Sequence, residues 1–135
     1  MMCCSFFNLA EEVRAFEKCG IDLLHIDVMD GAFVPNFALG TDFVRQLKAK
    51  TSIPMDIHFM VENPERHIDS FPIGVGDYVS IHCETTTHLQ RTLALVKAKG
   101  AKVLLALNPA TPLEAVREVA SITGEKLLKS PTYGG

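Results

Sequence analysis

Polar residues that can transfer protons or bind metal ions recur at alternate positions near the ends of three apolar segments. They are His25 and Asp27, then Asp56 and His58, and finally Ser80, His82 and Glu84. Side chains two residues apart in a β-strand project to the same side of the sheet. Each group is therefore expected to present its side chains on one face of its strand.

Imidazole and carboxylate groups together suit a borderline divalent metal ion such as zinc, manganese, iron or cobalt. In parallel α/β sheets, ligands bind where the carboxyl ends of the strands meet. Each histidine is also compatible with a structural role, buried in the core and hydrogen-bonded to backbone. Because three neighbouring strands end in His or Asp, we expect a metal site at this end of the sheet.

Strand and helix patterns alternate along the chain. Mostly apolar strands are predicted at residues 21–28, 54–61, 77–82 and 102–107. Helices are predicted between and after them: from a cap at Asn8 to Gly20, from a cap at Thr41, over 64–70, from Leu89 to Gly100, and from a cap at Thr111. Such alternation predicts an α/β fold with a parallel sheet and right-handed crossovers.

The length of the chain limits how many such units it contains. A complete (β/α)₈ barrel needs about 200 residues or more, whereas 135 residues supply five or six units. No Ser- or Gly-rich linker divides the sequence, so we expect one partial-barrel domain over residues 1–135. Unpaired strand edges in such a piece predict self-association into homo-oligomers.

Composition excludes several classes of protein. The chain is 47% hydrophobic with a formal net charge of −3, which argues against disorder and against nucleic acid as a partner. The apolar runs are too short for a membrane span. The four cysteines form no metal-binding or C-x-x-C spacing and predict reduced thiols and a cytoplasmic location.

Three ordered motifs resemble those of the ribulose-phosphate 3-epimerase family. They are residues 24–31 (LHIDVMDG) with 33–36 (FVPN), residues 56–61 (DIHFMV), and residues 107–112 (LNPATP). The resemblance covers about residues 7–119. The related allulose-6-phosphate 3-epimerases share these motifs, so the sugar phosphate stays open between a pentose and a hexose.

The resemblance implies a TIM-barrel isomerase that inverts C3 of a ketose phosphate, converting D-ribulose 5-phosphate to D-xylulose 5-phosphate through an enediolate. It implies that His25, Asp27 and His58 are metal ligands and that Asp27 is also a catalytic acid/base. Inversion needs an acid/base group on each face of the planar intermediate, while a divalent metal ion stabilises its charge.

The resemblance also implies substrate contacts. His58, Met29 and Met60 would line the space near the enediolate, although core packing explains the two methionines equally well. The ending of the chain resembles the family's phosphate-binding loop, which places Gly134 and Gly135 at the phosphate. His82 is expected to support the site rather than to bind the metal ion.

Several positions depart from the family pattern. The sequence contains no counterpart of the family's second catalytic Asp, which lies on the seventh strand, or of a substrate-contacting Ser on the first strand. Ala32 stands where a His is usual, and Thr132 where a Gly is usual. The sequence therefore looks like part of a longer enzyme.

Two functions of different classes follow from these observations. The first is a metal-dependent ribulose-phosphate 3-epimerase of the pentose phosphate pathway, or its allulose-6-phosphate counterpart. The second is a non-catalytic fragment that binds a metal ion through His25, Asp27 and His58. A metal-dependent lyase or aldolase on the same barrel is a third reading, but it leaves the three motifs unexplained.

Overall fold

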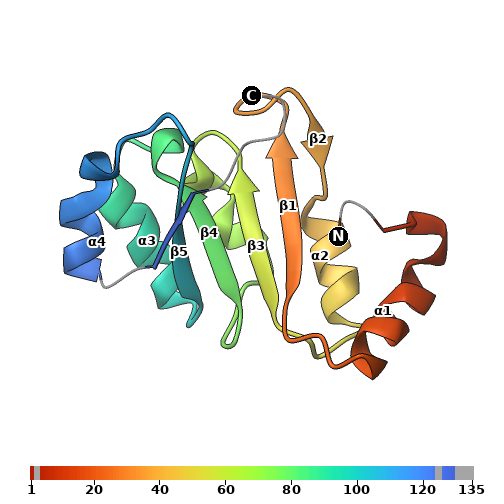
Figure 1. The fold of residues 1–135 in the computed structure, drawn as a ribbon. Coiled ribbons are helices and arrows are strands. Elements are labelled where there is room, and N and C mark those ends of the chain that lie inside the picture. Colours follow the sequence, from red (N-terminus) through yellow and green to blue (C-terminus); the bar gives the residue numbers. More distant parts are fainter. Residues whose placement is uncertain (2–3, 124–125, 130–135) are drawn as a thin grey trace.

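Five parallel strands and one short antiparallel strand form a single sheet in the described part of the chain (Figure 1). The structure is a computed structural model that describes residues 1, 4–123 and 126–129. The strand order is β2-β1-β3-β4-β5-β6. The strands are β1 (Leu24–Asp30), β2 (Phe37–Ala38), β3 (Met55–Met60), β4 (Tyr78–His82), β5 (Lys102–Leu107) and β6 (Lys126–Lys129).

Helices alternate with the parallel strands as the pattern predicts, except between β3 and β4, which only 3₁₀ turns connect. The helices are α1 (Leu9–Lys18), α2 (Thr41–Lys48), α3 (Leu89–Ala98) and α4 (Arg117–Thr123). Single 3₁₀ turns cover Phe6–Asn8, Pro64–Arg66, Ile68–Ser70, Cys83–Thr85 and Leu113–Val116. Gly20 and Gly100 follow α1 and α3 with φ of +67° and +82°. This left-handed backbone favours glycine and confirms the predicted helix ends.

The capping contacts predicted at the starts of the helices are wrong. Asn8 precedes α1, but its side chain makes no cap hydrogen bond. Thr41 is the first residue of α2, so Gly40 occupies the cap position. Pro112 caps the turn before α4, and the hydroxyl of Thr111 donates instead to Glu84. The segment predicted as one helix over 64–70 forms two 3₁₀ turns.

The two faces of the sheet differ in chemistry because side chains alternate along each strand. One face packs in a single apolar core with Val44 and Leu47 of α2 and Leu93 and Val96 of α3. Its strand residues are Ile26, Val28, Ile57, Phe59, Val79, Ile81, Val103 and Leu105. The intervening positions belong to the opposite face, which therefore carries the polar residues His25, Asp27, Asp56, His58, Ser80 and His82.

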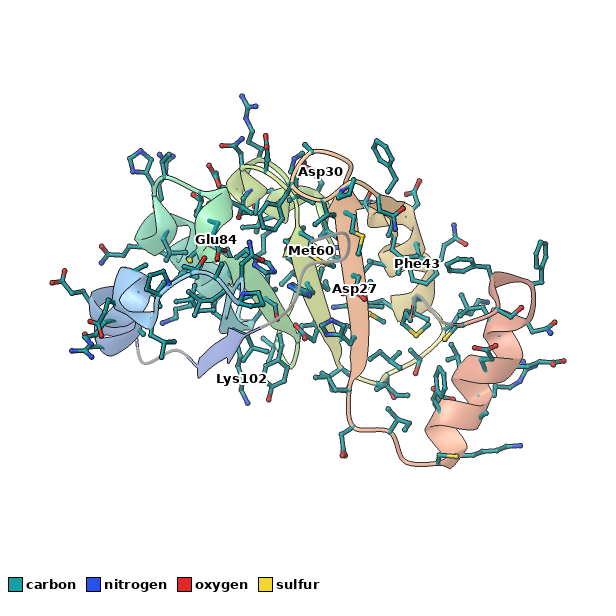
Figure 2. All side chains as sticks on the ribbon, turned by 45° about the horizontal axis from the view of Figure 1, so that its top comes forward. Asp27, Asp30, Phe43, Met60, Glu84 and Lys102 are labelled. Carbon is teal, nitrogen blue, oxygen red and sulfur yellow. The ribbon has the colours of Figure 1, made fainter. Side chains whose placement is uncertain are left out.

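The strands β1, β3 and β4 end at the same edge of the sheet, as their arrowheads show (Figure 1). Asp30 ends β1 at this edge, while Lys102 begins β5 at the opposite one (Figure 2). Within the described residues, no helix combines the length and apolar character that crossing a membrane requires.

Candidate functional site

The strand register places the predicted site residues side by side. Asp27 of β1 is paired with His58 of β3, and His25 is paired with Asp56 in the same ladder. His58 is paired in turn with Ser80 of β4. Figure 2 labels Asp27 partway along β1. The three strands therefore bring these polar side chains together on the face that the helices leave uncovered.

His25, Asp27 and His58 turn one ligand atom each toward a common point. Nε2 of His25 lies 3.1 Å from Oδ1 of Asp27, and Nδ1 of His58 lies 3.4 Å from the same oxygen. The three ligand atoms all lie within 4.8 Å of one another. Ligands about 2.1 Å from a tetrahedral ion lie about 3.4 Å apart, so this spacing suits a metal ion.

Exposure differs sharply among the three residues. The side chain of His58 is 2% exposed and that of Asp27 13%, whereas 45% of the His25 side chain is exposed. Solvent therefore reaches the site from the side of His25. An ion held there would have two buried ligands and one at the surface.

The charges at the site shift the ionisation of these groups. Hydrogen bonds to Asp27 and then to Asp56 raise the pKa of His25 to about 9, against the opposing effect of burial. Burial opposes ionisation of Asp27, but hydrogen bonds from His25 and His58 outweigh it and hold the pKa of Asp27 well below its ordinary value. Asp27 is therefore a carboxylate at neutral pH.

The second ring nitrogen of each histidine has a partner of its own. Nδ1 of His25 lies 2.7 Å from Oδ2 of Asp56, which is buried. Nε2 of His58 lies 2.9 Å from Nε2 of His82, which is also buried. Burial and the nearby His58 lower the pKa of His82 to about 4, so His82 is neutral at pH 7. The structure thus places His82 beside His58 and outside the three-residue cluster.

The two methionines lie one step further along the same face. Met29 and Met60 are paired neighbours on β1 and β3. Both are buried and form a small cluster with Val34, against which Phe33 and Ala38 pack. Core packing explains their burial, and their contact with a substrate stays a prediction.

The two remaining histidines, His67 and His88, are exposed and take no part in this cluster. Gly134 and Gly135, together with Thr132, lie outside the described residues.

The sequence predicts no contact for two residues that shape the site, Asp56 and Asp30. Asp56 was recognisable by its spacing from His58, but its contact with His25 depends on strand register. Asp30 accepts hydrogen bonds from the backbone N–H groups of Ala32, Phe33 and Glu62. It thereby ties the loop after β1 to the end of β3, a contact that no spacing rule predicts.

Comparison with known proteins identifies relatives along nearly the whole chain. Residues 1–134 match the model of the "Ribulose-phosphate 3 epimerase family". The chain is 42% identical over 135 residues to the chloroplastic ribulose-5-phosphate-3-epimerase of Arabidopsis thaliana, covering 97% of this chain and 48% of that protein. It is 40% identical over 132 residues to the ribulose-phosphate 3-epimerase of Bacillus subtilis, covering 96% of this chain and 61% of that protein.

A third relative is the ribulose-phosphate 3-epimerase of Aquifex aeolicus, 38% identical over 126 residues, with 93% of this chain and 57% of that protein covered. The chain therefore spans about half to three fifths of the length of these relatives. The described residues contain the cluster of His25, Asp27 and His58. The three relatives are all named as 3-epimerases of ribulose phosphate.

Proposed function

Because the chain belongs to the ribulose-phosphate 3-epimerase family, we propose that it carries the metal-binding part of an isomerase that inverts C3 of D-ribulose 5-phosphate to give D-xylulose 5-phosphate. The observation that supports the proposal most directly is the convergence of His25 Nε2, Asp27 Oδ1 and His58 Nδ1. Two imidazole nitrogens and one carboxylate oxygen that face one another at these distances can bind a divalent cation placed between them.

The donor set fits the divalent ion that the family resemblance implies. Two imidazole nitrogens and one carboxylate oxygen are ligands that zinc, manganese, iron and cobalt all accept. Bound between His25, Asp27 and His58, such an ion would supply positive charge to stabilise the negative charge that develops on substrate oxygens.

Asp27 would move the proton on one face of the substrate. Its Oδ1 contacts both histidines, whereas its Oδ2 has no hydrogen-bond partner among the described residues. Because the carboxylate is ionised at neutral pH, Oδ2 would accept the C3 proton and return it. His58, Met29 and Met60 would contact the sugar, and Gly134 and Gly135 its phosphate.

A metal titration tests the first part of this proposal. The chain, stripped with a chelator, is titrated with Zn²⁺, Mn²⁺, Fe²⁺ or Co²⁺ in a calorimeter, alongside His58→Gln and the control His88→Gln. We expect His58→Gln to weaken binding by about 100-fold or more, and His88→Gln to bind like the parent chain. Equal binding by all three proteins would place the ion elsewhere.

Turnover of D-ribulose 5-phosphate and of D-allulose 6-phosphate then separates the two sugar classes. Metal binding without turnover of either substrate would favour the second candidate, a metal-binding fragment of the longer enzyme.

The place of action in the cell belongs to the proposal as well. The cysteine pattern favours the cytoplasm, and the plant relative is named chloroplastic. Localisation of a tagged chain in its source cell distinguishes these compartments.

A further inference from the structure

The loop that connects β1 to β2, residues 31–36, contains a sequence motif to which the proposed function assigns no role. The two strands pair antiparallel at the base of this loop, Asp30 with Phe37. In Figure 2, Asp30 lies at the end of β1, and Asp27 lies further back along the same strand. The loop therefore leaves the sheet at its carboxyl edge, beyond the proposed metal cluster.

The side chain of Asp30 holds both the start of this loop and the end of the neighbouring strand. Its Oδ1 accepts hydrogen bonds from the backbone N–H groups of Ala32 at 2.9 Å and Phe33 at 3.0 Å. Its Oδ2 accepts another, at 2.8 Å, from the backbone N–H of Glu62, which follows β3. Burial opposes the ionisation of Asp30, but these backbone donors hold its pKa below the ordinary value. One carboxylate thus fixes the loop relative to β3.

The loop places two apolar side chains across the ends of the strands. Val34 is 2% exposed and packs with Met29 and Met60. Phe33 packs against the same cluster, and the centroid of its ring lies 5.1 Å from that of the His82 ring on β4. The loop therefore crosses from β1 over the end of β3 to the end of β4.

This apolar layer lies one step of the strand register beyond the metal cluster. Asp27 is paired with His58, and two residues further along the same strands Met29 is paired with Met60. The two pairs share one face of the sheet because side chains two residues apart do so. His58 and Met60 are 2% and 1% exposed, whereas the side chain of His25 is 45% exposed. The site is thus closed toward the loop and open beside His25.

We propose that Asp30 is a positioning residue that holds Phe33 and Val34 as an apolar roof over the metal cluster. The roof keeps water from the carboxyl edge of the site, and the sugar phosphate enters from the side of His25. Negative charge that develops on substrate oxygens is stabilised more strongly where water is excluded. The inference deepens the proposed function, because it assumes that this cluster is the metal site.

Methionine oxidation measures the roof without a metal ion or a substrate. Met29 and Met60 lie beneath the roof, whereas Met55 is fully buried in the core on the helix-covered face of the sheet. The chelator-treated chain is incubated with hydrogen peroxide, and the sulfoxide at each methionine is followed by peptide mass spectrometry. We expect Met29 and Met60 to react at least about 10-fold more slowly than in the urea-unfolded chain. Equal rates in the folded and unfolded chains would overturn the proposal.

The variant Asp30→Asn tests the positioning role. It keeps the shape of the side chain but replaces one acceptor oxygen with an N–H₂ group that faces a backbone donor. We expect oxidation of Met29 and Met60 to become about 10-fold faster, with Met55 unchanged. The control Asp69→Asn, at a position that is 82% exposed, should react like the parent chain. Unchanged rates in Asp30→Asn, or faster oxidation at all three methionines, would contradict a local positioning role.

The variant Phe33→Ala tests the roof itself and serves if Asp30→Asn fails to fold. It removes the ring that lies against His82, so we expect faster oxidation of Met29 and Met60 here as well. Phe7 is fully exposed, and Phe7→Ala is the matched control that should leave both rates unchanged. Slow oxidation in Phe33→Ala would mean that Phe33 covers neither methionine.

The loaded chain supplies a second readout. Asp30 contacts none of the three proposed ligands, so we expect Asp30→Asn to bind Co²⁺ like the parent chain. Exchange of the C3 proton of D-ribulose 5-phosphate should fall by about 10-fold in this variant, because water enters the site. Faster methionine oxidation without a fall in exchange would overturn the role of Asp30 in the reaction.

The two readouts separate failure of this inference from failure of the proposed function. A chain that binds no metal ion, but whose slow methionine oxidation is relieved by Asp30→Asn, would refute the metal site and leave the roof standing. A chain that binds the ion and exchanges the proton, while Asp30→Asn changes neither oxidation nor exchange, would refute the positioning role alone.

Discussion

At the scale of single residues, the ionised carboxylate of Asp27 favours a positive charge at the centre of the His-Asp-His cluster. Nε2 of His25 and Nδ1 of His58 both face Oδ1 of Asp27, at 3.1 Å and 3.4 Å. A metal ion would supply that charge. Without one, a proton on His25 does so, since Asp27 and Asp56 raise the pKa of His25 to about 9. The metal ion and the proton therefore compete for the same place.

This competition makes the stability of the metal-free chain depend on pH. The pKa of His25 is raised from 6.5 in the unfolded chain to about 9 in the fold, so protonated His25 stabilises the fold. The contribution is fully present below pH 6.5 and is lost as the pH rises through about 9. Because 45% of the side chain is exposed, solvent screening reduces the effect to on the order of 1 kcal/mol.

Urea unfolding in the presence of a chelator, at pH 6 and pH 9.5, measures this loss. The variant His25→Gln is expected to lack this part of the pH dependence, whereas the exposed-site control His88→Gln retains it. A parent chain equally stable at both pH values, or a His25→Gln variant with the same dependence, would contradict the assignment.

At the scale of elements, one buried carboxylate joins the starts of two strands to a helix. Asp77 precedes β4 and accepts hydrogen bonds from the backbone N–H groups of Met55 at 3.1 Å and Gly74 at 2.9 Å. It also forms an ion pair with Lys48 of α2. Asp77 is 4% exposed, so its removal leaves these donors without an acceptor inside the protein.

We expect Asp77→Ala to lower the free energy of unfolding by about 3 kcal/mol, because a buried charge with several donors is lost. The control Asp42→Ala removes a carboxylate that is 81% exposed and paired with Arg45, and it should cost less than about 1 kcal/mol. Urea unfolding of the two variants provides the comparison. Equal losses of unfolding free energy in the two variants would mean that the buried contacts of Asp77 stabilise the fold no more than an exposed ion pair does.

The periodic pattern of the sequence predicts where helices and strands lie better than it predicts the contacts that they make. Residues 102–107 alternate with helices at a regular step and form β5 as predicted. The first strand is predicted from residue 21 but begins at Leu24, and Ile21 is 43% exposed. The two-residue strand β2 has no periodicity to detect. Residue type alone predicts a helix cap at Thr111, but its hydroxyl donates a hydrogen bond to Glu84 instead of accepting one from a helix N–H.

For the site, the sequence predicts which face of its strand each residue occupies, but not which residues meet across strands. Spacing places His25 with Asp27, and Asp56 with His58, on common faces. Which residues touch across strands depends on register, which is determined by packing of the whole core. The contacts from His25 to Asp56 and from His58 to His82 link residues 31 and 24 positions apart, and no local pattern contains them.

At the scale of the whole molecule, the sheet has an edge that strand pairing does not cover in the described residues. β2 pairs with Met29 and Asp30 alone, which leaves the rest of this side of β1 without a strand partner there. The carbonyl of His25 accepts a hydrogen bond from the amino group of Met1. Self-association through such an edge stays a prediction, which sedimentation velocity at increasing concentration tests.

At the same scale, the outcome of the proposed reaction depends on how many acid/base groups face the substrate. Asp27 contacts both His25 and His58 and would serve one face of the substrate. The family resemblance implies a second Asp for the opposite face, and this sequence contains no counterpart of it. One group can remove a proton and return one to the same face. Inversion at C3 requires delivery to the other face.

We therefore expect the chain on its own to exchange the C3 proton of D-ribulose 5-phosphate with solvent faster than it forms D-xylulose 5-phosphate. Incubation in heavy water with Mn²⁺, Zn²⁺ or Fe²⁺ allows deuterium at C3 and xylulose 5-phosphate to be followed together by NMR. Asp27→Asn should abolish the exchange, while Asp42→Asn, at an exposed position on α2, should leave it intact. Epimerisation at about 1–10³ per second, an ordinary enzymatic rate, would show that another group serves the second face. Exchange that survives Asp27→Asn would remove Asp27 from its proposed role.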